Sequence, residues 1–371
     1  MLLSLGSDVL RLIFAFCNAV DDLNASTATC VKLRLEVLDF KACQVQVKVA
    51  KYFNDERQPS SRRELLRWFD LLHKEQVVLT GGETHPRRNI LYRPASDTFR
   101  RLCAIGVKRI TDFESIFHDG KIYVLSGADS ISLGVVESCD ILLNTWSEEP
   151  SIPGALTALA CATHQGELFI SGGQDRRQGV RSSRSTLIYR LTNRRSWDEV
   201  HVQLQKGRSH HGCVFYRGKM WVAGGVLENC PQPTGTVECV DINLQTSTAS
   251  SMLRRRFRPR LYVIDDNLYV VGGDVDYNET TIERFDLTTQ SWELCCIFPL
   301  KRLGCASAVV GTRIYVFGGG HGTSPTCDSY DYFDVIQRWG SRAKSAADTY
   351  LSYSNGFNDA LKDSVAVTLK F

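Results

Sequence analysis

The sequence VVLTGG at residues 77–82 recurs with variations along most of the chain. Later copies are LFISGG (168–173), MWVAGG (220–225), LYVVGG (268–273) and IYVFGG (314–319), and IYVLSGA (122–128) is a weaker copy. Counted by the first glycine, at residues 81, 127, 172, 224, 272 and 318, the spacings are 46, 45, 52, 48 and 46 residues. A repeat of this length with short apolar strands is typical of a β-propeller with one blade per copy. We therefore predict a mainly β chain built around a six-bladed propeller.

A second strand in each repeat ends in an aromatic or small residue, usually followed seven positions later by another aromatic residue. We expect large rings to fill the wedge between neighbouring blades, and the glycines to permit a tight bend where a Cβ would clash. These residues are therefore predicted to be structural. The pairs are Tyr92 and Phe99, Cys139 and Trp146, Tyr189 and Trp197, Phe285 and Trp292, and Tyr332 and Trp339, and blade four carries Val240 and Ser247 instead.

Three short phrases accompany the diglycine and the aromatic pair: VESCD (136–140), VECVD (237–241) and IERFD (282–286). Together these features resemble kelch repeats over residues 76–371. The resemblance implies a kelch-type propeller, whose repeat residues hold the blades and whose loops present the binding surface.

The first blade lacks a strand at its N-terminal side. Every later diglycine strand follows another short apolar strand, whereas the residues before 77 read as a charged helix. The missing pattern occurs at the other end of the chain, in DSVAVTLKF (363–371). We predict that this C-terminal strand enters blade one and closes the ring, which removes the exposed edges of an open sheet.

Composition sets broad limits on the class of protein. The chain has 371 residues, 43% of them apolar, and a net charge of +3, which by itself is too small to indicate nucleic acid. None of the 13 cysteines stands in a CxxC pair, which favours buried free thiols in a reducing compartment. The N-terminus has no signal-peptide pattern and no run of 18 apolar residues is present, so we expect no membrane partner and a cytoplasmic or nuclear location.

Cationic residues gather on one predicted face of the propeller. Alignment on the diglycine places Arg208, Arg256, Arg302 and Lys362 at one equivalent position before the first strand of a blade, where blades two and three carry Ile110 and Leu156. The loop after residue 173 and the run RRRFR (254–258) add further arginines to this face. We call this predicted set the arginine arc. The loop contributes Arg176, Arg177, Arg181 and Arg184.

Three interpretations of the arginine arc remain open. The side chains can be solvated or support the loops; they can bind an acidic or phosphorylated peptide through bidentate guanidinium contacts; or they can bind nucleic acid, which the sparse aromatic residues disfavour. His210 and His211 lack a carboxylate or cysteine at ligand spacing and are predicted to be polar rim residues, with no metal or cofactor expected. The candidate substrate-binding residues are Arg176, Arg177, Arg208, His210, Arg256, Arg302 and Lys362.

The first 75 residues lack the repeat and are predicted to be helical, with a module at 1–40 and a helical linker at 41–75. LGSDVLRLIFAF (5–16), Asp22-Leu23 and CVKLR (30–34) resemble an F-box, with Gly6 for the usual proline and Leu33 for the usual tryptophan. The resemblance implies that residues 1–40 dock on the adaptor of a cullin-RING ubiquitin ligase. The residues implied to face the adaptor are Leu5, Asp8, Val9, Ile13, Phe14, Leu23 and Cys30.

Taken together, the two resemblances imply a non-catalytic substrate receptor, in which the N-terminal helices bind the adaptor and cullin core and the propeller binds an unidentified target protein. One alternative is a kelch interaction scaffold of another kind, including a fragment of a protein that docks a cullin through a BTB fold. Another is a propeller enzyme resembling galactose oxidase or sialic acid epimerases. No base, acid and ligand pocket can be united from the sequence, so no catalytic residue is predicted.

Overall fold

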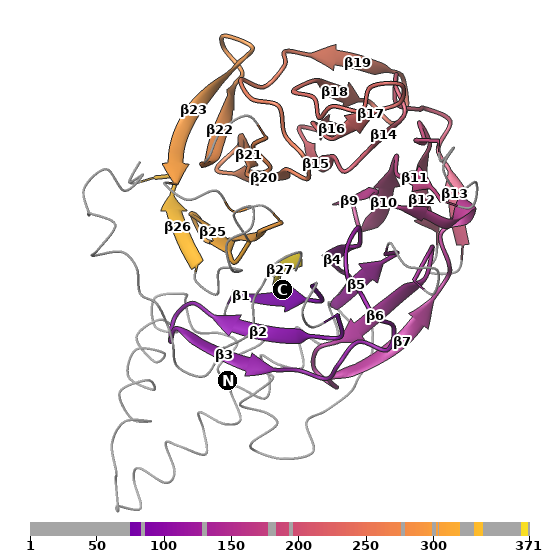
Figure 1. Cartoon of the computed structure of the whole chain (residues 1–371), viewed down its shortest axis with the longest axis vertical. Coiled ribbons are helices and arrows are strands. Elements are labelled where there is room, and N and C mark those ends of the chain that lie inside the picture. The colour runs from indigo at the N-terminus through magenta and orange to yellow at the C-terminus, as the bar shows by residue number, and fades with distance from the viewer. Residues whose placement is uncertain are drawn as a thin grey trace, which may run out of the picture. The chain divides into compact units, whose positions relative to one another are not determined.

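A computed structural model of the chain describes residues 75–82, 86–127, 132–176, 183–192, 196–275, 279–298, 302, 304–319, 330–336 and 365–369. These residues form a ring of six antiparallel sheets, the six-bladed propeller predicted from the repeats (Figure 1). The predicted N-terminal module at 1–40 and the linker at 41–75 lie outside the described residues, apart from residue 75.

The first three blades are four-stranded meanders. Blade one contains β27 (Val365–Leu369), β1 (Gln76–Thr80), β2 (Asn89–Arg93) and β3 (Thr98–Arg101). Blade two contains β4 (Glu114–His118), β5 (Lys121–Leu125), β6 (Val136–Asp140) and β7 (Thr145–Glu149). Blade three contains β9 (Ala160–His164), β10 (Glu167–Ser171), β12 (Ile188–Thr192) and β13 (Ser196–Glu199).

Blades four and five repeat the four-stranded pattern, and three strands of blade six are described. Blade four contains β15 (Gly212–Tyr216), β16 (Lys219–Ala223), β18 (Val237–Val240) and β19 (Thr246–Ala249). Blade five contains β20 (Arg260–Ile264), β21 (Asn267–Val271), β22 (Thr280–Asp286) and β23 (Ser291–Phe298). Blade six contains β24 (Ala306–Val310), β25 (Arg313–Phe317) and β26 (Tyr330–Asp334).

Short elements occur in the loops of blades three and four. Two-residue strands pair in the loops: β8 (Leu156–Thr157) with β11 (Gln174–Asp175), and β14 (Arg208–Ser209) with β17 (Val226–Leu227). A 3-10 helix, η2 (Pro153–Ala155), precedes β8. Within the described residues no helix is long and apolar enough to cross a membrane.

The C-terminal strand closes the ring, as predicted. β27 pairs with β1 in antiparallel register, from Gln76 opposite Leu369 to Thr80 opposite Val365. Its Thr368 side chain also binds blade six, because the hydroxyl donates to the Val309 carbonyl at 2.6 Å and accepts from the Val309 amide at 3.2 Å. The two ends of the propeller sequence are therefore held together in one sheet.

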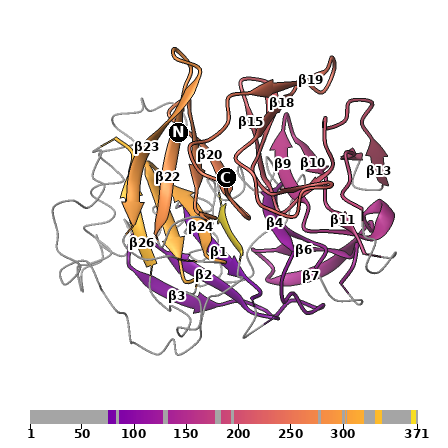
Figure 2. The ribbon, with the colours of Figure 1, turned by 45° about the horizontal axis from the view of Figure 1, so that its top comes forward.

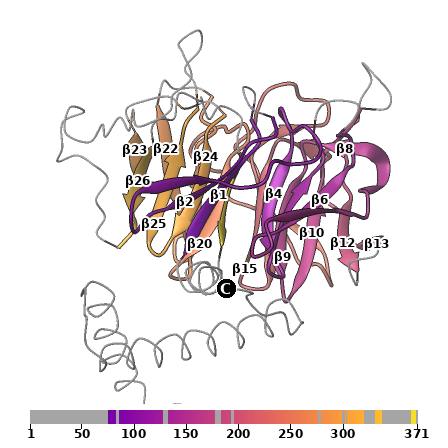
Figure 3. The ribbon, with the colours of Figure 1, turned by 90° about the horizontal axis from the view of Figure 1, so that it is seen from below.

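Within each blade the strands lie side by side, ordered from the centre of the ring to its periphery. The innermost strands contact their neighbours around the centre, as β4 contacts β9 and β15 contacts β20. The outermost strands β3, β7, β13, β19 and β23 lie at the rim (Figure 2). A side view shows neighbouring blades packed face to face (Figure 3). The residues that precede the innermost strands therefore meet at one end of the central axis.

Apolar cores fill the wedges between blades, as expected for the aromatic residues. Tyr92 of blade one, for example, lies 4.7 Å from Phe99 and 5.4 Å from Phe317 of blade six between ring centroids. A tryptophan of the outermost strand also donates to the carbonyl of the segment leaving the preceding blade. These bonds are Trp146 Nε1 to Cys103 O at 3.2 Å, Trp197 Nε1 to Pro150 O at 2.9 Å and Trp292 Nε1 to Ser250 O at 3.0 Å.

Two of the predicted side-chain pairs have a different register. In blade three Trp197 faces Leu191, and Tyr189 faces Glu199; in blade four Ser247 faces Cys239, one residue before Val240. The hairpins of these blades differ in length from the others, which shifts the cross-strand partner by one or two positions. Direct opposition is confirmed for three pairs, while Trp339 lies outside the described residues. The confirmed pairs are Tyr92 and Phe99, Cys139 and Trp146, and Phe285 and Trp292.

Candidate functional site

The three described arginines at the equivalent position of the arginine arc are buried. Arg208, Arg256 and Arg302 have exposed fractions of 1%, 0% and 2%. In blade two the equivalent side chain is Arg109, one residue before the expected Ile110, and it is also buried. The prediction that Arg208, Arg256 and Arg302 occupy one equivalent position is confirmed. The expectation that these three side chains form an accessible surface is wrong, because all three are buried.

Each buried guanidinium pairs with a carboxylate from the third strand of its own blade. Arg208 pairs with Glu238, Arg256 with Glu283 at 2.7 Å, and Arg302 with Asp331 at 2.6 Å. Arg109 pairs in the same way with Glu137 at 3.0 Å. Blade three has neither partner, because Leu156 and Tyr189 occupy these two places. The glutamate of the VE and IE phrases is therefore the internal counter-ion of the arginine.

The same glutamates also hold the segments that lead into each blade. The Glu238 carboxylate accepts from the Gln205 amide at 2.7 Å, and the Glu283 carboxylate accepts from the Leu253 amide at 2.8 Å. A carboxylate with both a guanidinium and a backbone N–H has partners for its buried oxygens, which offsets part of the cost of removing the charges from water. This repeated arrangement is structural.

The diglycines complete this joint between blades. The amide of Gly173, in blade three, donates to the backbone carbonyl of Arg208 at 2.8 Å, and the Arg208 Nη1 donates to the carbonyl of Gly224 in blade four at 3.0 Å. At Gly225 φ is +80°, and a Cβ would lie 2.3 Å from the Ser209 carbonyl oxygen. Arg256 makes the equivalent two bonds, to the Gly225 amide and the Gly272 carbonyl, so Arg208 and Arg256 each link the diglycine of the preceding blade to that of their own.

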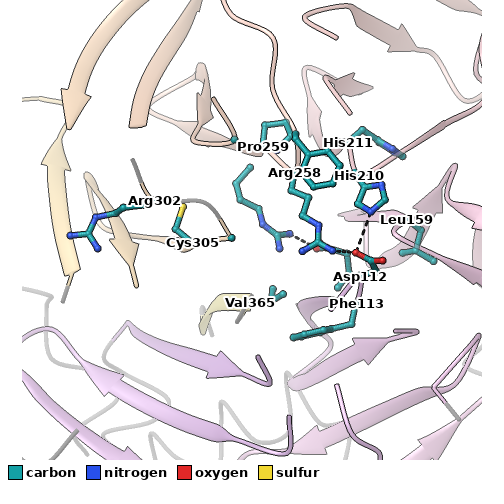
Figure 4. Close-up of a pocket in the computed structure, with 15 residues that line it drawn as sticks. Asp112, Phe113, Leu159, His210, His211, Arg258, Pro259, Arg302, Cys305 and Val365 are labelled. Atoms are coloured by element: carbon teal, nitrogen blue, oxygen red, sulfur yellow. Dashed lines mark hydrogen bonds and ion pairs between the residues drawn. The ribbon is translucent and has the colours of Figure 1, made fainter. Parts of the chain in front are cut away.

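A cavity of about 230 Å³ opens among the residues that precede the innermost strands. Residues from every blade line it, so it lies on the central axis at one end of the ring. Its charged and aromatic lining includes Asp112, Glu114, His210, Phe257, Arg258 and Arg260. Asp112, His210 and Arg258 are labelled in Figure 4.

Asp112 is the centre of the charged network in this cavity. Its carboxylate accepts from Arg176 Nη2 at 3.0 Å, faces His210 Nε2 at 3.1 Å and contacts the Arg258 guanidinium. Figure 4 shows the Asp112 carboxylate between the His210 ring and Arg258. Three cationic or polar side chains from blades three, four and five therefore converge on one carboxylate of blade two.

His210 is neutral around pH 7. Burial, together with the nearby charges of Arg176 and Arg184, lowers the pKa of His210 to about 4. The neutral ring can donate from Nε2 to Asp112 while Nδ1 accepts from the Ser209 hydroxyl at 3.1 Å, and Ser209 accepts in turn from Arg184 Nε at 3.1 Å. This chain of hydrogen bonds fixes the orientation of the imidazole.

A second ion pair accompanies the pair between Asp112 and Arg258. Glu114 and Arg260 stand two residues after Asp112 and Arg258, and their side chains form an ion pair across the cavity. Burial raises the pKa of Glu114, and the charge of Arg260 opposes that effect. Since blades two and five are opposite each other in a ring of six, both pairs join opposite sides of the axis.

The backbone at the cavity has a regular arrangement. In blades two to six the residue two positions before the innermost strand has positive φ: 59° at Asp112, 52° at Ala158, 55° at His210, 57° at Arg258 and 64° at Gly304. We call these five residues the mouth positions. The amide of one mouth position donates to the carbonyl of the preceding one, with N···O distances of 2.9, 2.8 and 2.8 Å for Ala158, His210 and Arg258. The side chains are thereby presented at one level from successive blades.

Cys305 lines the cavity, and Cys213 lies in β15 and packs against the apolar core between blades three and four. Burial raises the pKa of Cys213 to about 12 and that of Cys305 to about 11, so both are protonated at neutral pH. Across the described part of the chain, no group of three or more His, Cys, Asp or Glu side chains is placed to hold a metal ion.

The remaining site predictions are distributed as follows. Arg176 and His210 lie together at the cavity, and His211 is buried beside it, with Nε2 3.0 Å from the Ser171 hydroxyl. Arg177 and Lys362 lie outside the described residues, as do all the adaptor-facing residues. Substrate binding by the candidates stays a prediction. The adaptor-facing set is Leu5, Asp8, Val9, Ile13, Phe14, Leu23 and Cys30.

Sequence reasoning missed Asp112, Glu114 and Arg260, and treated Arg258 only as part of a basic run. A signal for the mouth positions was present, because each stands two residues before an innermost strand. Alignment at that position would have brought Asp112, His210 and Arg258 into one register. It would not have shown that opposite blades form ion pairs, since that depends on the diameter of the closed ring.

The closed ring of antiparallel meanders, with a diglycine after each second strand and a cavity on its axis, defines the chain as a kelch-type β-propeller. Residues 114–320 match the KLHDC2/KLHL20/DRC7 Kelch-repeats domain, and the chain belongs to this family.

Known relatives are similar over the same region. The chain is 27% identical over 212 residues to Kelch repeat protein M-T8 of Myxoma virus (strain Lausanne), covering 56% of this chain and 40% of the relative. It is 24% identical over 233 residues to Kelch-like protein 25 of Xenopus tropicalis, covering 60% and 38%. Kelch-like protein terF of Aspergillus terreus (strain NIH 2624 / FGSC A1156) is 24% identical over 258 residues, covering 65% and 54%. The chain thus spans about two fifths of the first two relatives, and the shared repeats support a protein-interaction scaffold.

Proposed function

We propose that this chain is the substrate-recognition subunit of an F-box-type cullin-RING ubiquitin ligase and binds its target protein over the cavity at the mouth positions. The observation that carries the target-binding half is the convergence of Arg176, His210 and Arg258 on Asp112 at this cavity. Propeller loops and the ends of the innermost strands commonly form such binding surfaces.

An acidic or phosphorylated segment is the proposed ligand at the cavity. The Arg176 side chain is 39% exposed while it holds Asp112, so it can bind a second anion from the solvent side. Guanidinium groups bind carboxylates and phosphates bidentately. The Phe257 ring stacks on His210 at 4.5 Å and adds an apolar surface beside the charges. In this proposal Arg208, Arg256 and Arg302 support the surface from below.

The ligase half of the proposal rests on the F-box resemblance of residues 1–40. Those residues hold the adaptor and cullin core, the propeller holds the target, and proximity allows other subunits to transfer ubiquitin. The proposed location is the cytoplasm, the nucleus or both.

Co-purification with the adaptor tests the ligase half. The full chain should recover the adaptor and the cullin, and the variant Ile13→Asp with Phe14→Asp should lose both while the propeller keeps its melting temperature. Failure of the unmodified chain to recover the adaptor, or equal recovery by the double variant, would refute this half.

A charge-reversed pair of variants tests the target half. Arg176→Glu should reduce ubiquitin-dependent turnover of cellular targets at least tenfold, measured by quantitative proteomics. Arg217→Glu is the matched control, because Arg217 follows the far end of β15 and its side chain is 56% exposed. Identical target profiles for the two variants would refute binding at the cavity.

A second candidate is a kelch scaffold of another kind, including a fragment that resembles BTB-kelch proteins. The observation in its favour is the match to 38% of the length of Kelch-like protein 25. Recovery of a cullin without the F-box adaptor would favour this candidate.

A further inference from the structure

Three exposed apolar side chains belong to the joint between blades four and five. Leu253, in the segment between β19 and β20, is 61% exposed, and Leu294 and Ile297 of β23 are 41% and 47% exposed. Large apolar side chains that are exposed singly are ordinary, whereas a contiguous group marks an interaction surface. We call these three residues the rim patch.

One carboxylate brings the two leucines of the rim patch together. The Leu253 amide donates to the Glu283 carboxylate at 2.8 Å, and Glu283 stands opposite Leu294 in the hairpin of β22 and β23. Cross-strand partners project to the same face of a sheet. Leu253 and Leu294 therefore approach Glu283 from the same face of blade five.

The equivalent joint between blades three and four shows that side chains at these two positions touch. There the Gln205 amide donates to the Glu238 carboxylate, and Thr248 stands opposite Glu238. The Thr248 hydroxyl donates to Gln205 Oε1 at 2.9 Å. Leu253 and Leu294 replace this polar pair by an apolar one, so the scaffold itself does not require leucine at either position.

The unusual length of β23 adds Ile297 to the same face. β23 has eight residues, whereas the other described outermost strands have four or five. Ile297 stands opposite Thr281. Thr281 and Glu283 share one face of β22, because both accept from Arg256 Nη2, at 2.8 and 2.7 Å. Ile297 and Leu294 therefore border one continuous surface.

The segment 253–258 leads from the rim patch to the cavity. It belongs to the crossing from β19 at the rim to β20 near the axis (Figure 1). The Arg254 side chain turns inward and is 12% exposed, whereas Leu253 and Arg255 on either side of it are exposed. Phe257 and Arg258 line the cavity. The amides of Leu253 and Phe257 are hydrogen-bonded to blade five, so a ligand meets a backbone that is already ordered.

A single ligand segment is long enough to cover the cavity and the rim patch. Leu253 and Arg258 are five residues apart and so at most about 18 Å from each other, which an extended ligand covers with about five residues. The exposed Arg255 lies between them and complements the charge of an acidic ligand. A second copy of the chain is a poorer fit, because the β-bulge at Ile282 and Glu283 twists the edge that another β23 would have to meet.

We propose that the target segment bound at the cavity continues outward over residues 253–258 and places two apolar side chains on the rim patch. This inference rests on the proposed function, because the anionic group of the segment binds at the cavity. The recognised sequence combines an acidic or phosphorylated residue with an apolar pair, roughly five to eight residues apart. The charge places the segment, and the rim patch selects among acidic segments.

Selection of a phage-displayed library of random peptides on the full chain tests the proposal. The unmodified chain should enrich peptides that contain an acidic residue and an apolar pair at this separation. The matched double variant is Leu253→Gln with Leu294→Thr, which introduces the residues of the joint between blades three and four. It should still select acidic residues but not the apolar pair, and should bind a synthetic copy of a selected peptide at least tenfold more weakly.

Three single variants complete the series. Ile297→Thr changes the rim patch independently and should also weaken the peptide. Leu244→Gln is the control, because Leu244 is 76% exposed in the hairpin between β18 and β19, and this variant should select the same peptides as the unmodified chain. Arg176→Glu should lose the acidic preference.

The outcomes separate this inference from the proposal for the cavity. If the unmodified chain selects no apolar pair, or the double variant selects the same peptides, the inference is overturned, while loss of the acidic preference in Arg176→Glu still supports binding at the cavity. An apolar pair without an acidic residue refutes binding at the cavity and, with it, the continuous segment. A dimer that becomes monomeric in the double variant, measured by analytical ultracentrifugation, would show that a second copy covers the rim patch and would also overturn the inference.

Discussion

Arg208 and Glu238 form an ion pair inside blade four, with 1% and 4% of their side chains exposed. The Arg208 guanidinium also donates to the Gly224 carbonyl of the same blade at 3.0 Å, and the Arg208 backbone carbonyl accepts from the Gly173 amide of blade three at 2.8 Å, so this residue is part of the connection between neighbouring blades. Burial lowers the pKa of Arg208, and Glu238 opposes that effect. Loss of either partner leaves a charge without compensation in a medium that solvates it poorly.

Removal of one charge from this pair should destabilise the propeller strongly. Glu238→Gln is expected to lower the free energy of unfolding by about 3 to 5 kcal/mol, and Arg208→Glu should prevent folding. The double variant Arg208→Leu with Glu238→Tyr reproduces the residues of blade three and should cost less than the single change Arg208→Leu. Urea unfolding of the four variants measures this.

The surface variant Arg217→Glu is the control for that series, and its urea midpoint should barely change. A folded Arg208→Glu protein of normal stability would contradict the structural role of the pair. Whether Arg208→Glu folds also matters for tests of substrate binding, because loss of binding by this variant is informative only if the variant folds.

A Cβ at Gly225 should disrupt the close approach of the blade-four diglycine to the segment that precedes β15. Gly225→Ala is expected to cost about 3 kcal/mol or more, because the added carbon meets the Ser209 carbonyl and the backbone has φ of +80°. Gly218→Ala is the control: its φ is +75°, but nothing lies within 4 Å of an added Cβ, so strain alone should cost about 1 kcal/mol. Equal melting temperatures would show that the close approach at Gly225 is unimportant.

Acid should weaken the fold through His210. The pKa of this residue is about 4 in the folded protein against an ordinary 6.5, so between these values the unfolded chain binds more protons. The free energy of unfolding should fall as pH decreases from 6.5 towards 4, by on the order of 3 kcal/mol from His210, with no effect of this residue above pH 6.5.

The variant His210→Asn isolates this contribution, because asparagine tolerates the φ of 55° and does not titrate. Its unfolding free energy should depend less steeply on pH between 6.5 and 5, by up to about 1.4 kcal/mol per pH unit. His211, whose pKa is also lowered by burial, should keep part of the slope. Parallel curves for variant and parent would contradict the assignment.

Deletion of residues 362–371 should destabilise the whole ring. β27 buries Val365, Val367 and Leu369, each worth about 1.5 to 3 kcal/mol, and its loss exposes the edge of β1. Thermal unfolding should shift to lower temperature in a single transition, and a synthetic peptide of the deleted residues should restore part of the loss. An unchanged melting temperature would mean that closure by β27 contributes little.

Much of the fold could be predicted because it repeats. The diglycine period fixes the number of blades, and the absence of a first strand before Val77 identified residues 363–371 as its replacement. The depth of Arg208, Arg256 and Arg302 could not be read from their register, because a repeat position has the same sequence signal at the surface and below it. The acidic counter-ions of these arginines could have been identified from the sequence. Blade three lacks both the arginine and the acidic residue at the equivalent positions, so the two residues occur together or not at all.

The candidate site was harder to predict for a geometric reason. Asp112 and Arg258 come from opposite blades, and their contact depends on how closely the innermost strands approach the axis of the closed ring. Local periodicity contains no information about that distance. His210 and Arg176 were identified because they belong to basic clusters, but the carboxylate that brings them together was not.

The mouth positions have a consequence for how such a surface can change. Backbone amides and carbonyls join Asp112, Ala158, His210 and Arg258, so the connection between blades does not require any particular side chain there. An acidic, a small, an imidazole and a guanidinium group already occupy equivalent places in a single chain. Substitutions among residues that tolerate positive φ can therefore diversify ligand preference while the scaffold is preserved, which makes these positions suitable for a designed library of binders.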